Sequence, residues 1–167
     1  MKISVTSGDI SRTPSDALIT AINSGGAWFG GIDGVIMRAA GPMFHDQASR
    51  AMPLEDGKAV IAKGGQHDGS FRNVVFVVDD LQRPLREIVL AGLLGAESAG
   101  FATVTLPTIR MGVMLGVVEK SLDEALSEMA AGVKAFLTKQ PKAVQSITFV
   151  VYNDPPTELL LRTALEA

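Results

Sequence analysis

Two apolar runs, residues 17–22 and 74–78, constrain the fold of this chain more than any other feature of its sequence. They read ALITAI and VVFVV, and neither alternates regularly between apolar and polar positions. A strand with one wetted face alternates, whereas a strand that is apolar throughout is covered on both faces. The first run and the segment NVVFVVDD at residues 73–80, which contains the second, therefore predict strands of a sheet that helices cover on both sides.

Segments with helical periodicity lie between further strand-like segments along the chain. Apolar side chains recur at i, i+3, i+4 and i+7 in residues 83–99 and again from residue 122 to residue 137. SLDE at residues 121–124 has the pattern of a capping box at the start of the second helix. Other segments complete the expected order: strands in residues 2–10, 58–65, 101–107 and 145–152, a helix over residues 33–40 ended by Gly41-Pro42, and a last helix capped by Asp154 with Pro155 in its first turn.

This alternation predicts an α/β protein, a three-layer α/β/α sandwich with a central mixed, largely parallel sheet. With 167 residues, the chain suits one domain spanning residues 1–167. Residues 88–109 carry only one charge, Glu97, but glycines and Pro107 interrupt them. We expect a buried helix and a buried strand there rather than a membrane span. The N-terminus lacks an apolar signal core, so we expect a cytoplasmic protein.

Composition excludes several kinds of chemistry. The formal net charge is −3 and no basic run occurs, so we expect no nucleic-acid partner. The chain has no cysteine, which removes disulfides and thiol catalysis. Its two histidines, His45 and His67, have no carboxylate pattern typical of a metal site, and we expect them to be surface or capping side chains. We therefore expect no metal, no cofactor and no Ser-His-Asp catalysis.

Glycine is concentrated after one of the predicted strands. Five glycines fall in residues 25–34, and a second loop, residues 107–116, follows another strand. Residues 8–10 and 152–153 also follow strands, and the carboxyl ends of parallel strands share one edge of a sheet. Successive amides in such loops suit phosphate oxygens, although no familiar phosphate-binding motif occurs. The pattern indicates either an anion site formed by main chain or an ordinary glycine-rich surface loop.

Five short motifs in order resemble the macrodomains, a family that binds ADP-ribose. They are GDI at residues 8–10, TAIN at 20–23, DGVIMRAAGP at 33–42, PTIRMGVMLG at 107–116 and VVYND at 150–154. Together they extend over nearly the whole chain. The resemblance implies a macrodomain-like fold, with ADP-ribose or an ADP-ribosylated protein as the partner and no membrane partner.

The resemblance also implies individual roles. Asp9 would accept a hydrogen bond from the adenine amino group, Tyr152 would stack on or edge the adenine ring, and amides of residues 112–116 would hold the diphosphate. Asn23 would bind the distal ribose, and Asp33 would position water in members that hydrolyse their ligand, so Asn23 and Asp33 are the implied catalytic residues. The implied ligand-binding residues are Gly8, Asp9, Ile10, Asn23, Gly30, Gly31, Ile32, Asp33, Ile109, Arg110, Met111, Gly112, Val113, Met114, Leu115, Gly116, Tyr152 and Asn153.

Each implied side-chain role has a plain structural alternative. Gly8-Asp9 is equally a turn, Asn23 a cap that ends a strand, and Asp33 a helix N-cap. Tyr152 is equally an ordinary half-buried ring.

The sequence also departs from the family pattern. Met37 occupies the position of a family histidine, and a thioether cannot shuttle a proton. Trp28 and Phe29 replace glycines of the first loop, either as a hydrophobic plug or as an aromatic wall beside the distal ribose. Arg110 replaces a small residue of the second loop and either contacts a phosphate or points to solvent.

Three functions follow from these residues. The chain is an ADP-ribose-binding module, a hydrolase of an ADP-ribosyl ester or of O-acetylated ADP-ribose, or an interaction scaffold whose cleft Trp28 and Phe29 have filled.

Overall fold

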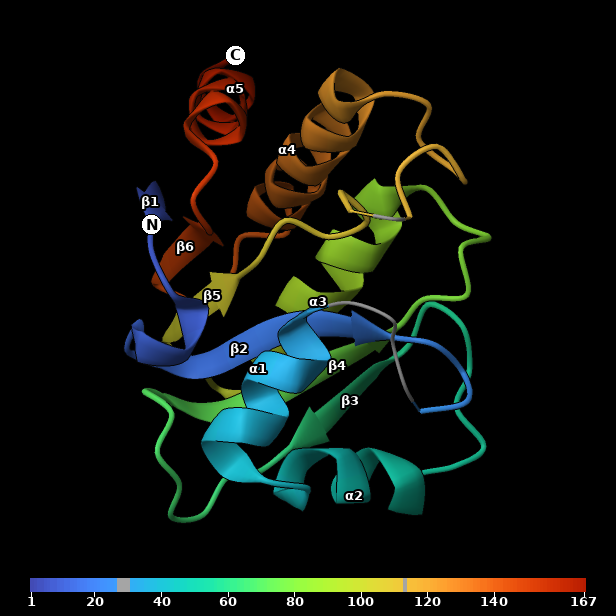
Figure 1. The fold of residues 1–167 in the computed structure, drawn as a ribbon. Helices are drawn as coiled ribbons and strands as arrows, with labels where there is room; N and C mark the ends of the chain where they lie inside the picture. Colours follow the sequence, from blue (N-terminus) through green and yellow to red (C-terminus); the bar gives the residue numbers. More distant parts are fainter. Residues whose placement is uncertain (27–30, 113) are drawn as a thin grey trace.

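The computed structural model describes residues 1–26, 31–112 and 114–167, which form one sheet with helices on its two faces (Figure 1). The strand order is β1-β6-β5-β2-β4-β3. The strands are β1 (Lys2–Ser7), β2 (Ser15–Ile22), β3 (Ala59–Ala62), β4 (Phe71–Val78), β5 (Thr103–Leu106) and β6 (Ser146–Val151). The helices are η1 (Ile10–Arg12, a 3₁₀ turn), α1 (Gly31–Ala40), α2 (Met43–Arg50), α3 (Leu85–Ala99), α4 (Leu122–Thr138) and α5 (Pro155–Glu166).

All neighbouring strands run parallel except β3, which pairs antiparallel with β4. The carboxyl ends of β1, β6, β5, β2 and β4 consequently face the same edge of the sheet. Helices α1 and α2 lie on one face, and α3, α4 and α5 lie on the other (Figure 1). The prediction of an α/β sandwich with a mixed, largely parallel sheet is confirmed.

The two central strands feed two separate cores. On β2, Ile19 packs toward α3 and α4 while Leu18 packs toward α1 and α2. On β4, Val75 and Phe76 divide in the same way. Because successive side chains of a strand point to opposite faces, a strand between two helical layers is apolar at nearly every position. This is the physical reason for the two apolar runs in the sequence, in which Thr20 is the one polar residue.

Helix α2 was not predicted from the sequence. Gly41 has a φ of 64°, and the amide of Asp46 donates to the carbonyl of Pro42 at 2.8 Å. The chain thus reverses at Gly41-Pro42 and becomes helical again at once. The helix buries only Phe44 and Ala48, so its apolar stripe is too short to stand out in the sequence.

The predicted helix caps are present. Ser121 Oγ accepts a hydrogen bond from the amide of Glu124 at 3.1 Å, and Asp154 Oδ1 accepts one from the amide of Thr157 at 3.2 Å. Glu124 reaches back to the amide of Lys120, one residue beyond the usual capping-box partner. Among the described residues, no helix is long and apolar enough to cross a membrane.

Glu97, near the end of α3, holds the segment that leads into β6. Its carboxylate accepts hydrogen bonds from the amides of Lys142, Ala143 and Val144 at 2.6–2.8 Å. Hydrogen bonds from the amides of Ala143 and Val144, and then from that of Lys142, hold the pKa of Glu97 below its usual value despite some burial. A carboxyl group with a lowered pKa in the folded state stabilises the fold above its unfolded pKa and loses that contribution as pH falls.

We therefore predict that Glu97→Gln lowers the melting temperature at pH 7, because an amide binds the three donors less strongly than a carboxylate. The difference from the unmodified chain should narrow as pH falls below the ordinary glutamate value of 4.5. Thermal unfolding followed by circular dichroism between pH 3 and pH 7 measures both effects, using roughly 0.5-unit steps to resolve the window. A difference that stays constant across this range would contradict the assignment.

Candidate functional site

The four loops that carry the motifs meet at the carboxyl edge of the sheet. Ser7 is in register with Val151, which places Gly8 beside Tyr152. Strand β5 lies between β6 and β2, so residues 107–116 follow the strand next to the one that residues 23–26 follow. The predicted convergence of these loops is therefore present in the fold, while the binding roles of their residues remain predictions.

Of the two carboxylate oxygens of Asp9, one accepts hydrogen bonds from the protein and the other accepts none among the described residues. Oδ1 accepts from the amide of Ser11 at 2.9 Å and from its hydroxyl at 2.7 Å, which caps η1. Oδ2 makes only a 3.9 Å ion-pair contact with Arg12. The hydrogen bonds from the side chain and then the backbone of Ser11 lower the pKa of Asp9, so the carboxylate stays ionised as an acceptor.

Tyr152 and Ile10 flank Asp9 in different ways. Tyr152 is 78% exposed, so the alternative of a half-buried ring is wrong. A ring this exposed buries little of its surface against the protein, and its stacking role remains a prediction. Ile10 is buried in the core under α1, which leaves only its backbone for a ligand. Asn153, next to Tyr152, is exposed and has a φ of 48°.

The first loop is tied to the end of β4. The amide of Asp79 donates to the carbonyl of Ile22 at 2.7 Å, and Asp80 Oδ1 accepts from the amide of Ser24 at 2.8 Å. Asn23 Oδ1 accepts from the amide of Gly25 at 2.9 Å, so Asn23 does cap the end of the strand. These bonds fix the point where the glycine-rich loop leaves the sheet.

The predicted amide cradle of residues 112–116 needs a correction. The amide of Leu115 donates to the carbonyl of Gly112 at 3.1 Å, and that of Gly116 donates to the carbonyl of Glu119 at 2.9 Å. These two amides are used inside the loop, so they are not available to a ligand in this conformation. Among the described residues, nothing pairs with the amides of Gly112 and Met114, and these two remain candidates.

Both expectations for the Arg110 side chain are wrong. It neither points to solvent nor stands ready for a phosphate, because its guanidinium is 1% exposed and pairs with two buried carboxylates. Asp79 Oδ1 and Oδ2 accept from it at 2.6 and 2.9 Å, and Glu119 Oε1 accepts at 2.9 Å. Glu119 also accepts from the amide of Leu85 at 3.0 Å, in the first turn of α3. Ile109 is likewise buried, and Met111 packs against the same core.

This ion network supports an unusual backbone. Arg110 has a φ of 64°, a left-handed conformation that costs a non-glycine residue about 1 kcal/mol or more. Burial opposes the charge on the guanidinium, but hydrogen bonds and Coulomb attraction from Asp79, and then from Glu119, raise the pKa of Arg110. The charged side chain thus anchors the start of the second loop to β4 and α3.

Asp33 lies in the first turn of α1 rather than at its N-cap, so the capping alternative is wrong. Its Oδ1 is 3.1 Å from Nε2 of His45, and the two side chains are 17% and 16% exposed. The expectation that His45 is a surface or capping residue is therefore also wrong. Sequence spacing gave no signal for this pair, because the α2 helix that carries His45 was not predicted.

The helix α1 brings Gly31 and Ile32 to its amino-terminal end. The first amides of an α-helix have no partner within the helix and point toward the preceding loop, where they attract anions. Predictions for Trp28, Phe29, Gly30 and Val113 lie outside the described residues.

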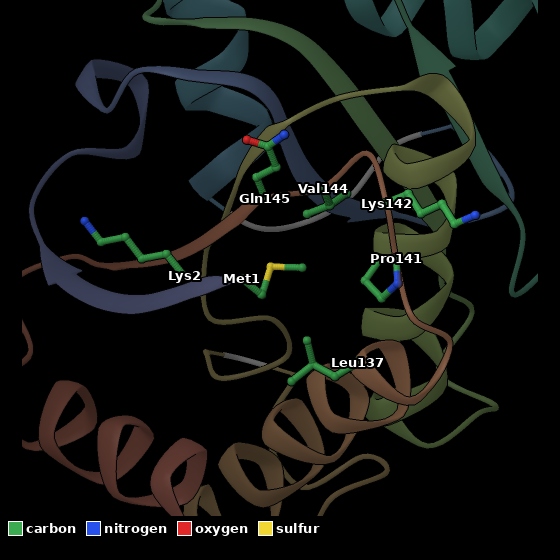
Figure 2. A pocket seen from close by; sticks show the side chains of 7 residues that line it. All are labelled: Met1, Lys2, Leu137, Pro141, Lys142, Val144 and Gln145. Carbon is green, nitrogen blue, oxygen red and sulfur yellow. The ribbon is translucent and has the colours of Figure 1, made fainter.

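Two hollows can be placed relative to this edge. One, of about 280 Å³, lies beside Asp9 and is lined by Asp9, Ser11, Arg12, Val35, Arg38, Ala39 and Asp68. Another, of about 720 Å³, lies at the amino ends of β1 and β6, where the Met1 and Leu137 side chains face each other (Figure 2). The second hollow has no residue of the motifs and lies on the opposite edge of the sheet.

The fold is an α/β sandwich whose motif-bearing loops lie at the carboxyl ends of parallel strands. A family model described as "Macro domain" matches residues 19–125, and the chain belongs to this family.

Relatives and solved structures agree with that membership. An O-acetyl-ADP-ribose deacetylase of Salmonella gallinarum is 28% identical over 96% of this chain and 93% of its own. An ADP-ribose glycohydrolase MACROD1 of Bos taurus is 44% identical over 63 residues, which are 38% of this chain and 19% of that relative. The crystal structure of a Trypanosoma brucei macrodomain in complex with ADP has a TM-score of 0.82 at 22% identity, covering 98% of this chain and 69% of that one. The last likeness shows the fold.

We predict that Arg110→Met lowers the free energy of unfolding by about 3–5 kcal/mol, since it leaves two buried carboxylates without their cation. Urea unfolding followed by circular dichroism measures the loss. Arg83→Met is the matched control, because Arg83 pairs with Asp56 through a side chain that is 47% exposed. An exposed pair contributes about 1 kcal/mol or less, so equal losses in the two variants would contradict the special position of Arg110.

Proposed function

We propose that this chain binds ADP-ribose at the carboxyl edge of its sheet. The observation that carries the proposal is the meeting of four motif-bearing loops at one edge, after β1, β2, β5 and β6. Membership in the macro domain family and relatives named for ADP-ribose chemistry support it. The proposed partner is free ADP-ribose or a protein that carries it.

The proposed binding mode divides the ligand among the loops. Adenine lies between Asp9 Oδ2, which accepts from the amino group, and the exposed ring of Tyr152. The diphosphate lies between the amides of Gly112 and Met114 on one side and the amino-terminal end of α1 on the other. Main-chain amides carry no formal charge, so a chain with a net charge of −3 can still hold an anion here. In this mode Asn23 hydrogen-bonds the distal ribose.

We expect calorimetry to show binding of ADP-ribose and saturating ligand to raise the melting temperature. Ligand at about 100 times Kd stabilises a protein by about 2.7 kcal/mol, which is about 5–10 °C for a chain of this size. No heat and no thermal shift at millimolar ligand would refute the proposal and would leave the interaction scaffold as the alternative.

Variants test the adenine end of this site. Asp9→Asn keeps an oxygen for Ser11 but replaces the acceptor of the adenine amino group, so we expect Kd to rise about tenfold or more. Tyr152→Ala should also weaken binding by about tenfold, through loss of the stacking face. The control is Glu166→Gln, an exposed carboxylate at the far end of α5, which should leave Kd unchanged.

Hydrolysis is a second candidate function, and the position of Asp33 favours it. One oxygen of this carboxylate is held by His45, and the other has no hydrogen-bond partner among the described residues. In the proposed deacetylation, Asp33 Oδ2 takes a proton from water while the water oxygen bonds to the acetyl carbon. The bond from that carbon to the ribose oxygen breaks, and the proton passes to the ribose oxygen. ADP-ribose and acetic acid result, and the acid ionises to acetate.

For this reaction we predict that Asp33→Asn lowers turnover of O-acetyl-ADP-ribose by about 10²-fold or more, because positioned proton transfer contributes about 10²–10⁴-fold. Chromatography of the released ADP-ribose measures the rate. Asp46→Asn, an exposed carboxylate on α2 next to His45, is the control and should keep its rate. Turnover that Asp33→Asn leaves unchanged would remove Asp33 from the reaction, and an unmodified chain that binds without turnover would be a binding module only.

A further inference from the structure

The pair of Asp33 and His45 joins two helices that the sequence does not connect by any motif. Asp33 lies in the first turn of α1, and His45 is the third residue of α2. The reversal at Gly41-Pro42 folds α2 back beside α1, which brings His45 Nε2 to 3.1 Å from Asp33 Oδ1. Both side chains are more than four-fifths buried, so solvent screens this contact less than a surface pair.

The histidine ring is held in one orientation. Its centroid lies 5.0 Å from that of Phe76, a fully buried residue of β4. Its other nitrogen, Nδ1, is buried and has no hydrogen-bond partner among the described residues. A proton on Nδ1 would be a buried donor without an acceptor, which costs free energy. The proton therefore belongs on Nε2, where it is donated to the carboxylate of Asp33.

This geometry separates the roles of the two groups. In a histidine that acts as a base, one nitrogen faces the substrate and the other faces a carboxylate. Here the second nitrogen of His45 is buried and has no partner among the described residues, so it is closed off from a ligand. Asp33 has the complementary arrangement, with one oxygen bound to the ring and the other without a partner among the described residues. The carboxylate, and not the imidazole, is the group that can meet water.

We propose that His45 is a positioning residue for Asp33, which it holds with the free oxygen turned to the ligand. The inference rests on the proposed function, because it assigns the support of a group in that same site. Met37, one turn after Asp33 on α1, is 43% exposed and has no hydrogen-bond donor. The chain therefore supplies from α2 a histidine contact to this carboxylate that residue 37 cannot supply from α1.

The test compares variants that remove the donor with one that keeps it. His45→Phe retains an aromatic ring against Phe76, and His45→Leu retains most of the volume, but neither can donate to Asp33. His45→Gln keeps an N–H donor on a side chain of comparable reach. Removing Nδ1 leaves no unpaired buried atom, so we expect the first two variants to fold, as thermal unfolding will show. His67→Leu controls for loss of a histidine, because His67 lies in the loop before β4.

The expected result is a loss of rate without a loss of affinity. With O-acetyl-ADP-ribose, His45→Phe and His45→Leu should lower kcat about tenfold or more, a part of the about 10²–10⁴-fold that positioned proton transfer contributes. The Kd for ADP-ribose should stay within about threefold, since the lost contact is not made to the ligand. His45→Gln should recover most of the rate, and His67→Leu should keep it. In the Asp33→Asn background, His45→Phe should cause no further loss.

Each contrary result overturns the inference. One is an unchanged kcat in both His45→Phe and His45→Leu. Another is a His45→Gln variant as slow as His45→Phe. The third is a further loss of kcat when His45→Phe is added to Asp33→Asn. Binding of ADP-ribose without turnover by the unmodified chain would overturn the role of His45 and leave the proposed binding function intact. Absence of binding would instead refute the proposed function, and this inference with it.

Discussion

The buried ion network of Asp79, Arg110 and Glu119 is the interaction on which the candidate site depends. Asp79 directly follows β4, Arg110 lies in the second loop, and Glu119 precedes α4 and accepts from the amide of Leu85 in the first turn of α3. Burying three charges costs several kcal/mol per ion, and the mutual attraction repays this only with good geometry. The four short contacts between these groups meet that requirement. The network therefore gives the loop one defined position rather than a large gain in stability.

The same end of β4 also positions the first loop. Asp79 donates its amide to Ile22, and Asp80 accepts from Ser24, so two consecutive residues anchor both loops of the proposed phosphate site. A ligand held by main-chain amides needs those amides fixed before it arrives, since ordering a loop on binding costs affinity. The charged side chains thus fix the backbone of the two loops, and in the proposed binding mode the main-chain amides hold the anion.

Features that depend on residues close together in the chain were predicted from the sequence, whereas contacts between distant residues were not. The runs of β2 and β4, the stripe of α4 and the caps at Ser121 and Asp154 are local patterns, and all were predicted correctly. The site was predicted only as an edge of the sheet with motif-bearing loops. The partners of Arg110 lie 31 and 9 residues away in the chain, and no local pattern reveals which of two chemically reasonable positions a guanidinium adopts.

His45 is a second residue whose contacts could not be predicted from local sequence patterns, because they depend on tertiary structure. Its role depends on α2, and α2 depends on a reversal at Gly41-Pro42 that in sequence reads simply as the end of a helix. Once that helix forms, the ring of Phe76 lies against that of His45, and Nε2 of His45 comes to 3.1 Å from Asp33 Oδ1. The sequence spacing of His45 does not mark it as a functional residue, but the packing of α2 makes it the hydrogen-bond partner of Asp33. The reactivity of Asp33 must therefore be assessed from its contact with His45 of α2 as well as from its own motif.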